Sequence, residues 1–247
     1  MTEAYIYDAI RTPRGKGKNT GSLHELSPVK LASKTLKKIK ERNNLDTKLI
    51  DDVVLGCVHP VNEQGSDIAR IAVLDADFDQ AVPGTQIDRF CASGLEACNI
   101  AAAQIMSGQS DMTIGGGVES MSRVPMGSAG GAWMTDPSIA FKTYFVPQGI
   151  SADLLATKYN YSRDDVDLFA VNSQIKASKA WKNNYFNSSI VDIYDQNGDL
   201  MLNHDELIRK DTTMQTLAAL EPSFKNIGKD SGLDKIALMK YPDYDQI

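Results

Sequence analysis

The sequence predicts an α/β fold in which a mostly parallel sheet is layered with helices. Segments typical of strands alternate with segments typical of helices up to about Met121, and this alternation favours a parallel sheet with right-handed crossovers. Residues 53–58 form a continuous apolar run, as expected for a strand that is buried on both faces. Because ligands bind at the carboxyl ends of the strands in such sheets, we expect functional residues there.

Local signals mark the elements of this first part. Ser27 and Pro28 start a helix, since serine caps a helix and proline fits its first position, and Gly108 is a natural C-terminal cap. Consecutive glycines from Gly115 to Gly117 weaken the strand around them, which makes sense if another backbone or a ligand approaches closely. We expect strands at residues 4–10, 53–58, 85–87 and 112–117, and helices at residues 28–43, 67–74 and 92–107.

The second part of the chain, from Ser122 onward, has a mixed character and is rich in glycine, methionine and aromatic residues. Ser162 with Asp165 is a capping arrangement for a long helix, and Asn197-Gly198 is a tight-turn signal. The tail from Lys225 is polar, and we expect no clear element in it. We expect helices that begin near Ser151, Ser162 and Thr212, and a strand at residues 190–194.

The composition excludes several classes of function. The formal net charge is -6, so a basic surface for nucleic acid is not expected. No apolar run has the length of a membrane span, and no signal pattern stands at the N-terminus. The cysteines, Cys57, Cys91 and Cys98, form no Cys-x-x-Cys pair. We therefore expect neither a metal site nor a disulfide framework, and we expect a reducing, cytoplasmic compartment.

Cys91 carries the strongest chemical signal. It lies between a predicted strand and the alanine-rich helix predicted at residues 92–107, where unpaired backbone N–H groups and the helix dipole favour a negative charge. A cysteine at such a position is favoured as the thiolate, which is the nucleophilic form. We expect the helix to be buried on all sides and Cys91 to lie at the floor of a pocket. The alternative is that Cys91 is a small buried hydrophobic residue.

Two motifs around Cys91 resemble the thiolases. Phe-Cys-Ala-Ser-Gly-Leu-Glu-Ala at residues 90–97 is similar to the nucleophile segment of that family, and Gly-Gly-Gly-Val-Glu-Ser-Met-Ser at residues 115–122 is similar to its glycine-rich strand and turn. The resemblance implies a thiolase-like layered fold and a two-step acyl transfer with Cys91 as the nucleophile. It also implies coenzyme A and acyl-CoA as substrates, with no prosthetic group.

The second part resembles the thiolase loop domain. This gives an N-terminal core domain at residues 1–121 and an α+β loop domain at residues 122–247, over the CoA site. Gln148 and Gly149 stand at the start of the family's substrate-covering helix, and Arg209 lies in the segment that meets coenzyme A. Arginine suits that contact because it stacks on a flat base and pairs with phosphate; the alternative is an exposed surface arginine. Many family members have His-Met in place of Pro147-Gln148, which leaves the acyl-chain preference open.

The resemblance covers only the first part of the family. The Gly-His-Pro and Cys-x-Gly-x-Gly motifs of the second thiolase core domain do not occur in this sequence, so we expect a truncated, poorly active form without the C-terminal core domain. The resemblance also implies a homodimer or homotetramer. Two alternatives stay open: a condensing enzyme of the ketoacyl-synthase kind, and a non-catalytic module for acyl-CoA binding or dimerisation.

Two further residues near the N-terminus invite a role. Arg11-Thr12-Pro13 resembles the thiolase N-terminus, and its arginine either meets an anion or lies in a solvated loop. His59 is followed by Pro60 in a predicted loop, which indicates a turn, and we assign it no catalytic role.

Overall fold

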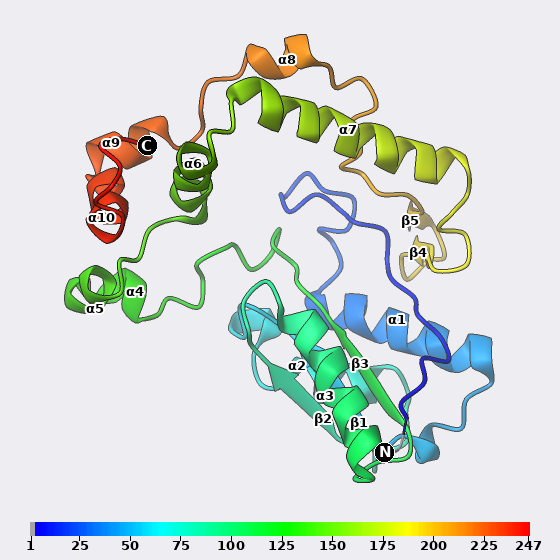
Figure 1. The fold of residues 1–247 in the computed structure, drawn as a ribbon. Coiled ribbons are helices and arrows are strands. Elements are labelled where there is room, and N and C mark those ends of the chain that lie inside the picture. The colour runs from blue at the N-terminus through cyan, green and yellow to red at the C-terminus, as the bar shows by residue number, and fades with distance from the viewer. Residues whose placement is uncertain (1–2) are drawn as a thin grey trace. The chain divides into compact units, whose positions relative to one another are not determined.

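The computed structural model describes residues 3–247, which form two compact units (Figure 1). The first unit contains the chain up to Ala129 together with Phe186–Leu207. The second unit contains Gly130–Tyr185 and Ile208–Ile247. The contacts therefore return residues 186–207 to the first unit, while the domain division expected after residue 121 stays a prediction.

The first unit is built on a parallel sheet. Its strands are β1 (Asp52–Gly56), β2 (Gly84–Ile87) and β3 (Thr113–Gly117), in the order β2-β1-β3. Val54 in the central strand pairs with Thr85 on one side and with Gly115 on the other. Because all of these strands run in the same direction, their carboxyl ends meet at one edge of the sheet. The predicted α/β class with a parallel sheet is confirmed.

Helices cover both faces of this sheet. α1 (Pro28–Asn43) and α2 (Ile68–Asp75) form a buried cluster with Val53 and Leu55 of β1. Because side chains alternate between the faces of a strand, Gly56 belongs to the opposite face, and there α3 (Ser93–Ser107) packs against it (Figure 1). A Cβ added to Gly115 would lie 2.7 Å from the Cα atom of Cys98 in α3. The close approach expected at the glycines of β3 is therefore made by helix α3.

The helices of the first unit start and end at the predicted signals. The Ser27 side chain accepts a hydrogen bond from the backbone N–H of Lys30 and caps α1. Asp67 caps α2 in the same way. α3 ends at Gly108, whose φ of 76° is a left-handed conformation that glycine adopts without steric cost. Short 3-10 turns, η1 (Thr47–Leu49) and η2 (Asn62–Gln64), flank β1.

The strand predicted at residues 4–10 is wrong. Within the described chain, residues 3–10 belong to no strand, and Arg11 alone forms an isolated parallel bridge with Ile190. The alternation of this segment indicates which side chains share a face. A strand also needs a neighbouring backbone whose carbonyls accept hydrogen bonds from its N–H groups and whose N–H groups donate to its carbonyls. Sequence alternation does not report that partner.

The loop that follows is anchored by a pair of acidic residues. The guanidinium of Arg11 makes two hydrogen bonds to the carboxylate of Asp205, at 2.8 and 3.0 Å. The carboxylate of Glu206 accepts hydrogen bonds from the backbone N–H of Lys16 at 2.7 Å and from the hydroxyl of Ser22 at 2.6 Å. Arg11 is therefore bound inside its own unit, by a carboxylate of the chain, and not in a solvated loop.

A hairpin immediately precedes these acidic residues in the chain. β4 (Ile193–Tyr194) and β5 (Leu200–Leu202) pair antiparallel, and Gly198 in the connecting turn has a φ of 88°, as the predicted Asn197-Gly198 turn requires. Ile193 and Leu202 are buried in a small cluster with Leu23. The strand predicted at residues 190–194 is thus confirmed in part, over its last residues.

The second unit is helical in the described residues, which include no helix long and apolar enough to cross a membrane. Ser162 and Asp165 form the predicted capping box of its longest helix. Thr213 caps α8, as predicted for the helix expected near Thr212. The helices are α4 (Ala132–Thr135), α5 (Pro137–Lys142), α6 (Gln148–Tyr159), α7 (Arg163–Lys182), α8 (Met214–Ala218), α9 (Lys225–Asp230) and α10 (Leu233–Lys240).

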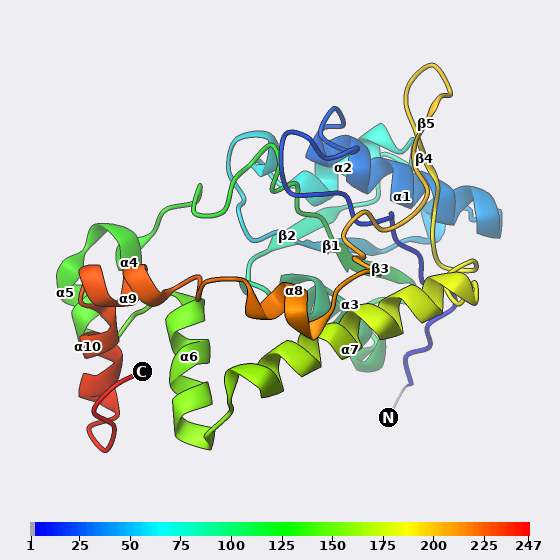
Figure 2. The same cartoon turned by 90° about the horizontal axis from the view of Figure 1, so that it is seen from above.

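The tail from Lys225 is not irregular as expected, because it forms α9 and α10. α10 lies beside α6 (Figure 2), and Ala237 of α10 is buried with Ile150 and Leu154 of α6. Phe224 and Ile247 pack against the same cluster. These short helices are stabilised by tertiary packing, which the polar sequence of the tail does not reveal.

Candidate active site

Cys91 lies in a tight turn between β2 and α3, at the edge where the parallel strands end. Backbone hydrogen bonds close the turn: Ala92 N–H donates to Arg89 O at 3.1 Å, and Ser93 N–H donates to Phe90 O at 2.9 Å. The Ser93 hydroxyl accepts a hydrogen bond from Arg89 N–H at 2.8 Å and donates one to Phe90 O at 2.6 Å. Cys91 is therefore held inside a turn whose ends are tied together twice.

Phe90, immediately before Cys91, has a strained backbone. Its φ is 49°, in the left-handed region that residues with a Cβ rarely adopt. Such a conformation costs on the order of 1 kcal/mol or more and is concentrated at functional sites. The carboxylate of Asp88 supports it by accepting a hydrogen bond from Phe90 N–H at 2.8 Å. A strained turn between a strand and a helix is also how other enzymes expose a nucleophilic side chain.

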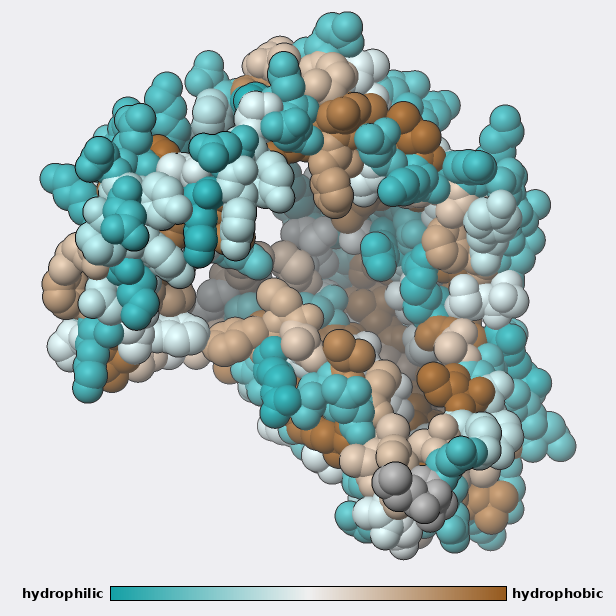
Figure 3. Space-filling model, in the orientation of Figure 1, coloured by the Kyte–Doolittle hydropathy of each residue, from teal (hydrophilic) through white to brown (hydrophobic). Residues whose placement is uncertain are grey.

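The surroundings of Cys91 differ from two expectations. Cys91 is exposed, so it does not lie at the floor of a pocket in the described unit. α3 buries only one face, with Ala97 and Ala101, whereas Leu95 is 68% and Met106 is 50% exposed. Hydrophobic residues reach the surface in the region of α3 (Figure 3). The small residues of α3 let the helix pack closely on the glycines of the sheet. The face of α3 that points away from the sheet stays exposed.

Cys57 is the chemical opposite of Cys91, although both follow strands of the same sheet. It is 1% exposed, and burial together with the negative charges of Glu119 and Asp88 raises the pKa of its thiol to about 12. Cys57 is therefore protonated at neutral pH. Cys98 is exposed on α3, so Cys91 and Cys98 are the two accessible thiols of this chain.

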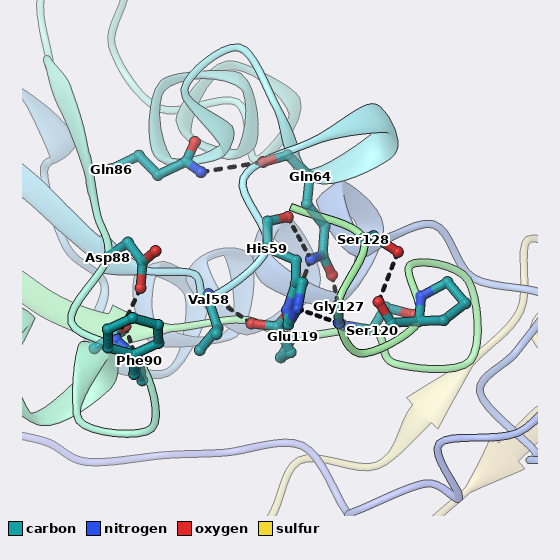
Figure 4. Close-up of polar contacts among 12 residues, drawn as sticks. Val58, His59, Gln64, Gln86, Asp88, Phe90, Glu119, Ser120, Gly127 and Ser128 are labelled. Atoms are coloured by element: carbon teal, nitrogen blue, oxygen red, sulfur yellow. Dashed lines mark hydrogen bonds and ion pairs between the residues drawn. The ribbon is translucent and has the colours of Figure 1, made fainter. Parts of the chain in front are cut away.

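A polar network joins the loops that follow the strands (Figure 4). Gln64, which is fully buried, lies at its centre. The Nε2 group of Gln64 donates to Glu119 Oε1 at 2.7 Å and to His59 O at 3.0 Å, and its Oε1 accepts from Ser120 N–H at 2.6 Å. Glu119 Oε2 accepts from Val58 N–H at 2.7 Å. No local pattern in the sequence indicates this network, because its two central residues are 55 positions apart.

His59 belongs to the same network. Its Nε2 atom accepts a hydrogen bond from Gly127 N–H at 2.7 Å, so in the neutral ring the proton is on Nδ1. Nδ1 lies 3.5 Å from Glu119 Oε1. The lone pair of Nε2 is therefore engaged within the network.

Gln148 and Gly149 lie in the second unit, as the first residues of α6. Gln148 is exposed and Gly149 is half-buried. A Cβ added to Gly149 would overlap the ring of Phe224. The glycine therefore makes room for an aromatic side chain of the same unit, whatever else it contacts.

Arg209 also lies in the second unit, and its side chain is exposed. Its backbone N–H donates to Gln174 Oε1 of α7 at 2.7 Å, and its carbonyl accepts from the Thr212 hydroxyl at 2.9 Å. The structure thus fixes the backbone at Arg209, while the role of its guanidinium stays a prediction. Among residues 3–247, no group of three or more histidine, cysteine or acidic residues is placed to hold a metal ion.

The fold and the site together define a class. The chain is an α/β protein whose parallel sheet is covered on both faces. It presents an exposed cysteine on a strained turn at the carboxyl edge of the sheet, where a cysteine nucleophile is expected. The family model of the thiolase N-terminal domain matches residues 4–230. The chain therefore belongs to the thiolase family, which confirms the resemblance and the layered fold and favours a thiolase over a ketoacyl synthase.

Curated relatives are similar over most of this chain. It is 38% identical over 239 residues to beta-ketoadipyl-CoA thiolase of Pseudomonas aeruginosa and 37% identical over 228 residues to 3-ketoacyl-CoA thiolase of Aliivibrio fischeri. It is also 37% identical over 250 residues to 3-oxoadipyl-CoA/3-oxo-5,6-dehydrosuberyl-CoA thiolase of Escherichia coli. These similarities cover 89%, 91% and 92% of this chain but 59%, 58% and 61% of the relatives. The chain thus spans about three fifths of their length.

Proposed function

We propose that this chain takes part in acyl transfer between CoA thioesters, with Cys91 as the residue that becomes acylated. The observation that carries the proposal is the position of Cys91: an exposed thiol, next to the strained Phe90, at the carboxyl edge of a parallel sheet. Family membership and relatives named for beta-ketoadipyl-CoA and 3-ketoacyl-CoA support a 3-oxoacyl-CoA as the substrate class.

The proposed chemistry has two steps. The thiolate of Cys91 attacks a thioester or 3-oxoacyl-CoA carbonyl, a new carbon–sulfur bond forms, and the leaving group departs as a CoA thiolate or as a CoA-bound carbanion that takes up a proton. A second acceptor, either coenzyme A or the carbanion of an acyl-CoA, then removes the acyl group from Cys91. The turn around Cys91 presents the exposed thiol at the start of α3.

The CoA contacts are proposed for the second unit. Arg209 suits phosphate and the flat adenine base because its guanidinium is planar, permanently charged and exposed. Gln148, exposed at the start of α6, and Gly149 are proposed to meet the acyl or pantetheine part. We place these contacts in the loop domain proposed at residues 122–247, and Cys91 in the core domain proposed at residues 1–121.

Low turnover by this chain alone is part of the proposal. The sequence contains neither a Gly-His-Pro motif nor a Cys-x-Gly-x-Gly motif, and in thiolases those motifs supply the histidine and the second cysteine that move protons. We also propose a homodimer or homotetramer, for which the exposed Leu95 and Met106 of α3 offer apolar surface, and a cytoplasmic location, which suits the free thiols.

Competitive labelling tests the role of Cys91. The folded chain is treated with a small excess of iodoacetamide, quenched at intervals, and mapped by peptide mass spectrometry. We expect Cys91 to react at least about ten times faster than Cys98, which is also exposed but lies inside α3. Equal rates for these two residues would contradict a primed nucleophile and favour a non-catalytic acyl-CoA-binding module.

A further inference from the structure

We infer that Gln64 is a positioning residue for Cys91. Its buried carboxamide makes hydrogen bonds to the loops that follow β1 and β3. Its backbone carbonyl accepts a hydrogen bond from β2, the strand that leads into the Cys91 turn. This inference rests on the proposed role of Cys91 as the nucleophile. Gln64 acts through the strand ends, since its side chain and its backbone carbonyl are hydrogen-bonded to residues 59, 86, 119 and 120.

The carboxamide of Gln64 fits its surroundings in one orientation. Both N–H bonds point at oxygens, those of His59 O and Glu119 Oε1, while the carbonyl oxygen faces the N–H of Ser120. A flipped amide would set oxygen against oxygen twice and N–H against N–H once. Because Gln64 is fully buried, water cannot replace a lost partner, and each broken contact leaves a buried polar group unsatisfied.

The network reaches the end of β1 through Glu119. This carboxylate bridges Gln64 and the backbone N–H of Val58, two residues after β1. The end of β1 is itself in contact with the Cys91 turn: Cys57 N–H donates to Ile87 O at 2.9 Å, and the backbone of Ser93 lies directly over Gly56. A shift of the loop after β1 would therefore displace Ile87 before the Cys91 turn and Ser93 after it.

A second connection runs through β2. Gln86 lies in this strand, five positions before Cys91. Its Nε2 group donates to the backbone carbonyl of Gln64 at 3.1 Å, and its Oε1 accepts from Ile68 N–H at 2.8 Å, at the start of α2. Figure 4 shows the side chain of Gln86 pointing toward the backbone of Gln64. Gln64 thus fixes the strand from which the Cys91 turn departs, as well as the strand on which that turn rests.

Such a network matters because reactivity is sensitive to small displacements. A reacting group must be held within a fraction of an ångström of its productive geometry, and a misplacement of about 1 Å can cost on the order of a hundredfold in rate. An apolar side chain at position 64 would fill the same volume, yet it would leave Ser120 N–H and one side of Glu119 without a partner. The glutamine is therefore suited to alignment and not only to filling space.

The test compares Gln64→Met with wild type by cysteine labelling. Methionine keeps the length of the side chain and removes its hydrogen bonds. We measure the ratio of Cys91 to Cys98 alkylation rates, with Cys57 as an internal reporter of folding, because a buried thiol labels only when the unit opens. The expected result is a fall of about tenfold in the Cys91:Cys98 ratio while Cys57 stays unlabelled.

Gln104→Met is the matched control. The Gln104 carboxamide also donates to a partly buried carboxylate, Asp52, at 2.9 Å, but this contact lies at the amino end of β1, away from the Cys91 turn. We expect the control to leave the Cys91:Cys98 ratio as in wild type. A ratio that falls equally in both variants, or in neither, would overturn the positioning role of Gln64.

A second variant covers the case in which Gln64→Met exposes Cys57. Glu119→Gln keeps the shape of the side chain, but its single carbonyl oxygen can serve Val58 N–H or Gln64 and not both. We expect a smaller fall in the ratio, about threefold, with Cys57 protected; an unchanged ratio would again count against the inference. A wild-type ratio near one would instead remove the proposed nucleophile itself, so the two failures are distinguishable.

Discussion

Gly56 at the end of β1 lies directly beneath Ser93, the first residue of α3. A Cβ atom added to Gly56 would overlap the carbonyl carbon of Ser93 and the backbone nitrogen of Gly94. Only glycine permits this separation, because the contact is made by backbone that cannot move aside as a flexible side chain does. The position of α3, and with it the turn that carries Cys91, is therefore set by a missing side chain in the neighbouring strand.

Gly56→Ala should destabilise the protein and displace the start of α3. The added methyl group would overlap three atoms of the Ser93–Gly94 peptide group, and overpacking of this kind costs about 1–3 kcal/mol. The free energy of unfolding, measured in urea, gives the cost, and the Cys91:Cys98 labelling ratio reports the displacement.

Gly116→Ala is the control for Gly56→Ala. Its Cβ would lie 3.6 Å from Leu55 Cδ2, an ordinary contact, so we expect little change in stability or labelling. If both variants unfold at the same urea concentration, the close approach of Ser93 to Gly56 does not define the position of α3.

Phe90 should tolerate residues that accept a left-handed backbone and reject those that do not. With a φ of 49°, Phe90→Asn is expected to keep the stability within about 0.5 kcal/mol, whereas the β-branched Phe90→Val should cost about 1–2 kcal/mol. Thermal or urea unfolding of the pair separates the two cases. Equal stabilities of the asparagine and valine variants would show that the turn is not strained at this residue.

Asp205→Asn should loosen the N-terminal loop. It removes a charge-assisted, two-point contact with Arg11 in which the carboxylate side chain is only 9% exposed, and hydrogen bonds of this kind contribute about 1.5–3 kcal/mol. Asp77→Asn, which breaks an ion pair whose carboxylate is 72% exposed, should change the stability little. Limited proteolysis after Arg11 and Arg14 reports the loosening, and equal protection in both variants would contradict the anchoring role of Asp205.

Cys57 should make the protein less stable at alkaline pH. Its pKa is raised to about 12 in the folded state from an ordinary value of 9.0, so above pH 9 the unfolded chain loses a proton that the folded chain retains. The contribution of the Cys57 thiol to the free energy of unfolding is fully present below pH 9. It falls between pH 9 and 12, by at most about 1.4 kcal/mol per pH unit. Cys57→Ala should flatten this slope in urea titrations at pH 8 to 10.5; an unchanged slope would assign it to other groups.

Local signals in the sequence predict the first unit well. Ser27-Pro28, Asp67 and Gly108 mark helix ends by chemistry that acts over one helical turn, and the structure has caps at these residues. The apolar run of β1 predicts a buried strand, and the glycines of β3 predict the close approach of another backbone. Both are local features of the sequence. The strand expected at residues 4–10 fails because pairing depends on a partner elsewhere in the chain, and alternation does not report it.

The candidate site could be predicted only as a position along the chain. The place of Cys91 between strand and helix follows from its neighbours, but the left-handed Phe90 does not, because phenylalanine carries no signal for that conformation. The network of Gln64 and Glu119 cannot be predicted from the sequence either, since glutamine and glutamate are ordinary surface residues. They become informative only once the structure shows Gln64 buried and hydrogen-bonded to Glu119. The helices after Lys225 depend on packing against α6 rather than on their own sequence.

Acylation by acetyl-CoA shows whether Cys91 is the nucleophile. The purified chain is incubated with acetyl-CoA, its intact mass is measured, and any adduct is located by peptide mapping. We predict a single acetyl group on Cys91, which is removed on addition of coenzyme A and is absent from Cys91→Ser. A folded chain that stays unmodified, or one that is acetylated on Cys98 as readily as on Cys91, would contradict it.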